Sequence, residues 1–98
     1  MLTFKHVGGN YYRTSEAIHG RDYTVPANFR FNVSVPEKYY WFVDPHDERY
    51  FEAAAVHDYV ILELGWSRWK SAFVWDHYLR GKVPLWKRAI LFAILATR

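Results

Sequence analysis

The sequence predicts an α+β fold in which a small N-terminal β-hairpin and extended region packs on a C-terminal three-helix unit. Before residue 36 the apolar segments are short and end at glycine, asparagine or proline, which is typical of strands and turns. After residue 37 the apolar stretches are longer, and a Gly-Trp-Ser break between two of them predicts an antiparallel helix pair. We therefore expect a single domain over residues 1–98, with residues 1–36 mainly β or extended and residues 37–98 mainly helical.

The first part of the chain is predicted to form strands joined by tight turns. Residues 2–7 are a candidate strand that ends at a Gly-Gly-Asn turn, residues 8–10. Residues 11–18 and 21–25 are predicted to pair as a hairpin, because His19-Gly20 separates them and Pro26 ends the second segment.

A half-buried extended segment is predicted next, over residues 29–35. Apolar and polar side chains alternate there, and Asn32 shares the polar face with Ser34. Residues 37–43 are predicted to form one or two helical turns. Residues 44–47 contain two aspartates, which predicts a loop that caps the central helix at its positive end.

The central helix is predicted over residues 50–61, where apolar side chains surround the axis, as expected for a buried helix. Gly65 is expected to end it and Ser67 to cap the second helix, residues 67–80. The last helix, residues 85–97, is shorter than the roughly 20 residues that span a bilayer. We therefore expect it to dock on the helix pair and expect no transmembrane segment.

Composition limits the functional classes. The sequence has no cysteine, which excludes disulfides and thiolate metal sites. No signal peptide is recognisable at the N-terminus. The net charge of +3 is spread along the chain and gives no specific signal for nucleic acid.

The central helix carries the residues that suggest chemistry. His57 and Asp58 have only apolar helical neighbours, so their partners must come from another element. Asp76 on the second helix is at the same distance from the turn as His57. Because equidistant residues of an antiparallel pair lie at one height, the spacing predicts that Asp76 faces His57 and fixes its tautomer.

The order of several short motifs resembles a family of small bacteriophage proteins known only as a domain of unknown function. The motifs are Val-Pro-Ala-x-Phe at residues 25–29, Ser-Val-Pro at 34–36, the pair His57-Asp58, and then Asp76. Members of that family usually have glycine where this chain has Asn28. The resemblance implies a phage origin, and with it a location in the bacterial host cytoplasm or in the virion.

The His-Asp pair with a second aspartate on an antiparallel helix is also distantly similar to secreted calcium-dependent phospholipases. That resemblance implies that His57 is a general base, that Asp76 orients it, and that Asp58 binds calcium. Asn32 and its neighbours would supply further calcium ligands, and no other cofactor is implied. The substrate would be a phospholipid or another ester.

Two other interpretations stay open at this stage. The His57, Asp58 and Asp76 side chains can form a buried network that fixes helix register without catalysis. The chain can also be a noncatalytic virion or tail component, or a counter-defence module that binds a host protein through an exposed aromatic patch at residues 39–42.

Overall fold

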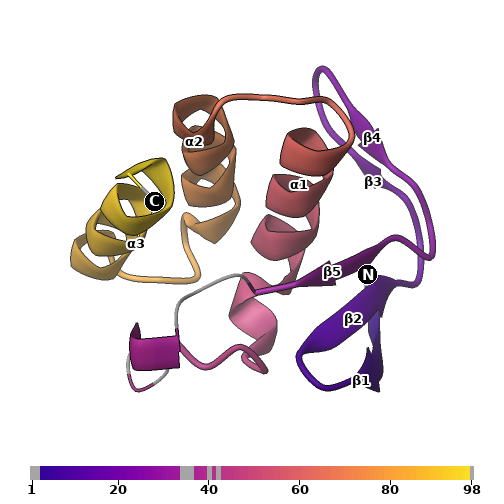
Figure 1. Ribbon diagram of the computed structural model, residues 1–98, viewed down its shortest axis with the longest axis horizontal. Helices are drawn as coiled ribbons and strands as arrows, with labels where there is room; N and C mark the ends of the chain where they lie inside the picture. The colour runs from indigo at the N-terminus through magenta and orange to yellow at the C-terminus, as the bar shows by residue number, and fades with distance from the viewer. Residues whose placement is uncertain (1–2, 34–36, 40, 42, 98) are drawn as a thin grey trace.

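The computed structural model describes residues 3–33, 37–39, 41 and 43–97, and it confirms the predicted α+β class. Short strands precede three helices, and α1 lies between α2 and the strands (Figure 1). The elements in chain order are β1 (Phe4–Gly8), β2 (Tyr11–Thr14), β3 (Ile18–His19), β4 (Thr24–Val25), β5 (Arg30–Asn32), the 3-10 turns η1 (Glu37–Tyr39) and η2 (Glu48–Tyr50), α1 (Phe51–Leu62), α2 (Arg68–Leu79) and α3 (Leu85–Thr97).

The main sheet is antiparallel, with β2 between β1 and β5. Tyr12 on β2 pairs with Phe31 on β5, and both side chains are buried. The ring of Phe51, the first residue of α1, lies 4.2 Å from that of Tyr12 and 6.1 Å from that of Phe31, measured between centroids. This aromatic cluster fixes the N-terminal end of α1 against the sheet.

The predicted hairpin between residues 11–18 and 21–25 is wrong in extent. β2 ends at Thr14 and pairs with β1 and β5, while only β3 and β4 pair with each other. The reason is the buried Thr14, whose backbone N–H donates to Phe29 O (3.1 Å) and whose hydroxyl donates to Pro26 O (2.9 Å). These bonds tie the end of β2 to the segment before β5 instead of to β4.

Asn28 explains how the chain tolerates the loss of the glycine expected from the motif. Its φ is +64°, in the left-handed region that glycine adopts most easily and that asparagine tolerates better than most residues. Its backbone N–H donates to Thr14 O (2.7 Å), and its carbonyl accepts from the Arg13 side chain (2.8 Å). Asn28 therefore preserves the turn that directs β5 toward α1.

The extended segment predicted at residues 29–35 is confirmed where the structure describes it. Phe31 and Val33 are buried and Arg30 is exposed, which is the predicted alternation. Ser34 and the other residues of the 34–36 motif lie outside the described residues. In the predicted aromatic patch, Trp41 is 83% exposed, and residues 40 and 42 also lie outside the described part.

The helix pair is confirmed, with α1 and α2 running in opposite directions around the predicted turn (Figure 1). Ser67 caps α2 by accepting a hydrogen bond from Lys70 N–H (3.1 Å). Gly65 has φ +66°, and the following N–H, of Trp66, donates to Val60 O (3.0 Å). Helix α3 then packs on α2, as predicted.

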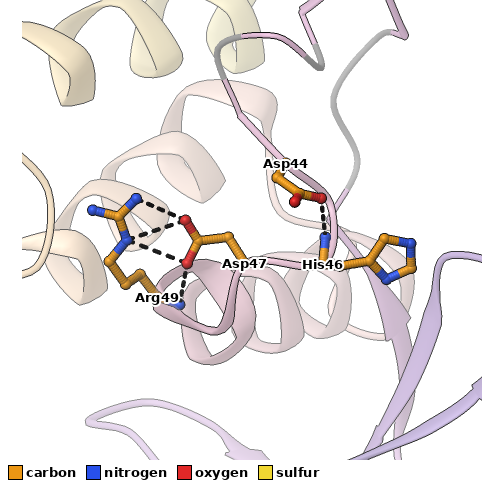
Figure 2. A network of polar contacts seen from close by, with 4 residues as sticks. All are labelled: Asp44, His46, Asp47 and Arg49. Atoms are coloured by element: carbon orange, nitrogen blue, oxygen red, sulfur yellow. Dashed lines mark hydrogen bonds and ion pairs between the residues drawn. The ribbon is translucent and has the colours of Figure 1, made fainter.

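The loop at residues 44–47 caps the entry to α1 through Asp47. This carboxylate accepts from the backbone N–H of Arg49 (3.0 Å) and pairs with its guanidinium (2.7 Å), while Asp44 accepts from His46 N–H (2.9 Å; Figure 2). The hydrogen bond from the Arg49 side chain holds the pKa of Asp47 below its usual value. Because η2 continues directly into α1, this cap helps to fix the helix that carries His57.

None of the helices in the described part of the chain has the length and apolar character needed to cross a membrane.

Candidate active site

His57 is the one buried histidine among the five in the chain, all of which the structure describes. It lies in the middle of α1 and is 6% exposed. Its ring meets Trp75 of α2 edge-on, with the centroids 5.9 Å apart and the ring planes at 72°. The imidazole is therefore held between the two helices of the pair.

Asp58 lies beside His57 and is fixed by the sheet. Its Oδ1 is 3.7 Å from His57 Nδ1, which is a charge contact too long for a hydrogen bond. Its Oδ2 accepts from the backbone N–H of Asn32, at the end of β5, at 3.1 Å. The structure thus brings together three of the four predicted site residues, with Asn32 acting through its backbone.

The predicted hydrogen bond between Asp76 and His57 is absent. The Asp76 carboxylate instead lies 3.4 Å from Arg88 of α3 and 3.5 Å from Arg80. Trp75 occupies the position opposite His57, and Asp76 lies about 100° further round the helix. Equal height in a helix pair fixes the level of a residue but not the direction of its side chain, and α3 supplies a cation that the pair alone did not reveal.

Of the predicted calcium ligands, the structure describes Asp58 and Asn32. Calcium takes six to eight oxygen ligands. Asp58 supplies one carboxylate, and one of its oxygens already faces the N–H of Asn32. The described residues contain no cluster of three or more histidine, aspartate or glutamate side chains that suits a metal. Asn32 and Asp58 are therefore neighbours, and the calcium site that would include them stays a prediction.

Three polar atoms in the packing around Trp75 have no hydrogen-bond partner in the described part of the chain. They are the Nε2 atom of His57, the Nε1 atom of Trp75 and the hydroxyl of Tyr50, whose ring stacks on Trp75 at 6.0 Å. A buried polar group without a partner costs roughly 1–3 kcal/mol. Unpaired polar atoms of this kind call for an explanation, and a catalytic role of the histidine is one that the geometry allows.

A cavity of about 280 Å³ borders His57 and Asp58. Its wall combines one cation, Arg68 at the start of α2, with apolar side chains from α1 and α3. The residues that line it are Asn32, His57, Asp58, Ile61, Leu62, Arg68 and Leu95. Sequence reasoning missed Arg68 and Leu95. The turn position of Arg68, directly after the cap Ser67, was a signal that could have placed it near the end of α1.

The fold and this cavity define an α+β protein with a buried histidine and a half-buried aspartate between a helix hairpin and a sheet edge. A family model described as "Protein of unknown function (DUF1353)" matches residues 10–95, so the chain belongs to that family. The match runs from just before β2 into α3 and includes every residue of the cavity. No curated protein and no solved structure is significantly similar to the chain. The resemblance to a domain of unknown function is thus confirmed.

Proposed function

We propose that this protein is a bacteriophage-encoded hydrolase that cleaves an ester, with His57 as the general base. The supporting observation is a buried histidine that has one ring nitrogen near a carboxylate, the other unpaired, and a cavity beside it. The phage origin, and with it the host cytoplasm or the virion as location, rests on the motif order. The distant similarity to phospholipases supports the ester as substrate.

The chemistry follows from the two nitrogens of His57. Asp58 lies at Nδ1 and favours a proton there, which leaves the lone pair of Nε2 as the base. Nε2 takes a proton from water as the water oxygen attacks the ester carbonyl. The proton then passes to the departing alcohol oxygen as the ester C–O bond breaks. Because Nε2 is buried, substrate binding must shift the packing around Trp75 to admit the water.

The cavity wall favours a substrate with both apolar and anionic parts. Leu62, which is 71% exposed, and Leu95 contribute apolar surface to the cavity. Arg68 provides a guanidinium suited to a phosphate or carboxylate. An anionic phospholipid has this combination. A neutral short-chain ester would reach the same base without using the cation.

The test compares hydrolysis by the parent chain and by His57→Ala, using 4-nitrophenyl acetate and micelles of an anionic phospholipid. We expect His57→Ala to abolish turnover of both substrates, because the base is removed. The matched control is His6→Ala, which removes an exposed imidazole on β1. We expect Arg68→Gln to raise KM for the anionic lipid about tenfold, while it leaves 4-nitrophenyl acetate unaffected.

Activity of the folded parent chain separates catalysis from a purely structural role of His57. If His57 is catalytic, the parent chain hydrolyses the ester and His57→Ala loses that activity, whatever stability the truncation of a buried ring costs. If the network only fixes helix register, the same variant unfolds at lower denaturant concentration and the parent chain has no activity to lose. Absence of ester hydrolysis by the folded parent chain would end the enzyme proposal.

A second candidate is a noncatalytic module that binds a virion component or a host protein. The observation that favours it is Trp41, a large aromatic side chain that is 83% exposed. The test is binding of purified candidate partners to the parent chain and to Trp41→Ala. If the chain binds its partner through Trp41, we expect the affinity of Trp41→Ala to fall at least tenfold. Trp86→Ala, which truncates another exposed tryptophan, serves as the control.

A further inference from the structure

A second cavity, of about 470 Å³, lies between the β3–β4 hairpin and α2. Residues 19–23 form one side, and Trp66, Lys70, Phe73 and Tyr78 contribute to the other. It shares no lining residue with the His57 cavity. Its volume is within the range of small-molecule sites, about 300–1,000 Å³. The proposed hydrolase chemistry makes no use of it.

Aromatic side chains give this cavity a defined shape. The Tyr23 ring meets the Trp66 ring edge-on at 5.9 Å, and its hydroxyl is 2.6 Å from that of Tyr78. Gly20 packs so closely on Tyr23 that a Cβ at position 20 would overlap the ring. Tyr23 is thus positioned by contacts from the hairpin, the turn before α2 and the last turn of α2. These contacts fix the aromatic wall of the cavity.

The charge around the cavity is predominantly positive. The cations of Arg21 and Lys70 line it against the single carboxylate of Asp22. Among the described residues neither Arg21 nor Lys70 forms an ion pair, and the Lys70 ammonium instead lies 3.8 Å from the centre of the Trp66 ring. A cation held by an aromatic face keeps its charge available for an incoming anion.

We propose that this cavity binds a planar aromatic anion, the chemical class that includes nucleoside monophosphates. The ring of the ligand packs against the exposed Phe73 and the tyrosine pair, where flat apolar surface is offered. Its phosphate or carboxylate is bound by Lys70 and Arg21, which approach from the two sides of the cavity. This inference does not depend on the activity at His57.

The experiment is calorimetric titration of the full chain with adenosine monophosphate, indole-3-acetate, adenosine and inorganic phosphate. We expect the two aromatic anions to bind, with adenosine at least about tenfold weaker and phosphate without measurable binding. The ratio of the two aromatic anions tells a nucleotide site from a more general one. Failure of both to bind at millimolar concentration, or phosphate binding as tightly as either, would overturn the proposal.

Substitutions and an NMR titration test where the ligand binds. The double variant Arg21→Gln, Lys70→Gln should weaken the aromatic anions about tenfold or more, whereas Lys5→Gln, which removes an exposed cation on β1, should not. Amide resonances of residues 19–23 and 70–78 should shift on titration, while those of Asn32 and His57 stay in place. Unchanged affinity in the folded double variant, or shifts confined to other residues, would contradict the assignment.

Discussion

The two cavities differ in how deeply they are built into the core. The His57 cavity borders a histidine that is 6% exposed and packs on Trp75, which is 2% exposed. The second cavity is lined by hairpin residues at the surface and by Phe73, which is 62% exposed. At the His57 cavity, a substitution that alters the candidate catalytic residues also alters the core. At the second cavity, a substitution can alter binding with little effect on the fold.

The two cavities also differ in whether the polar atoms near them have hydrogen-bond partners. Around Trp75, three buried polar atoms have no partner in the described part of the chain. At the second cavity, the hydroxyls of Tyr23 and Tyr78 satisfy each other at 2.6 Å. Burial at that site raises the pKa of Tyr23 well above its usual value. The core beside the first cavity therefore holds polar atoms without a protein partner, whereas the two tyrosine hydroxyls at the second cavity are paired.

The largest expected effect comes from Trp75→Ala. This variant removes a buried aromatic side chain that contacts both Tyr50 and His57, so we expect a loss of about 3–5 kcal/mol in the free energy of unfolding. Phe73→Ala at the second cavity should cost less than about 1 kcal/mol, because most of the ring is already exposed. Urea denaturation measures both. Similar losses in the two variants would break the distinction between a core site and a surface site.

A smaller effect is expected from Gly20→Ala. The added Cβ must displace the Tyr23 ring, which loses its hydrogen bond to Tyr78 and its contact with Trp66. We expect a cost of about 1–2 kcal/mol. Tyr23→Phe keeps the ring and loses only the hydroxyl, so it should cost about 1 kcal/mol or less. Ester hydrolysis should be unchanged in both variants, and a drop in hydrolysis would show that the cavities are coupled.

Local signals predicted the helices well because each depends on a few adjacent residues. The cap at Ser67 needs one hydroxyl and one N–H three residues later, and the turn at Gly65 needs one residue with positive φ. The alternation through Phe31 likewise depends on a single strand. These features can be predicted from the sequence because no distant partner decides them.

The site was predicted less well because its geometry depends on distant elements. His57 and Asp58 were identified from their apolar neighbours, but the direction of Asp76 depends on Arg88, twelve residues later on α3. Arg68 and Leu95 reach one cavity only after three helices have packed. The second cavity depends on Tyr23 meeting Tyr78, a contact between residues 55 positions apart. Periodicity within one element carries no information on such contacts.

Substitutions of Asp47 measure how much the cap of η2 stabilises the start of the helix that carries His57. Asp47→Ala should cost about 1 kcal/mol at neutral pH, because it removes both the cap and the ion pair with Arg49. Asp47→Asn keeps a cap acceptor and loses only the charge, so it should cost about half as much, since Arg49 is half exposed.

The pH dependence of the Asp47 variants has a defined sign. The pKa of Asp47 is lowered in the folded chain, so its charge stabilises the fold above the unfolded value of about 3.9. That contribution is lost as the pH falls through the lower folded pKa. The gap between the parent chain and Asp47→Asn should therefore narrow as the pH falls below about 4. A gap that stays constant down to pH 2 would mean that the ion pair does not stabilise the fold.

The smallest expected effect is that of calcium on thermal stability. A single carboxylate, with one oxygen already accepting from Asn32 N–H, should bind calcium no more tightly than the millimolar range. The ion should then raise the melting temperature by less than about 3 °C at 1 mM, and Asp58→Asn should remove at most that small rise. Magnesium at the same ionic strength is the control. A larger, calcium-specific rise that disappears in Asp58→Asn would support the predicted metal site.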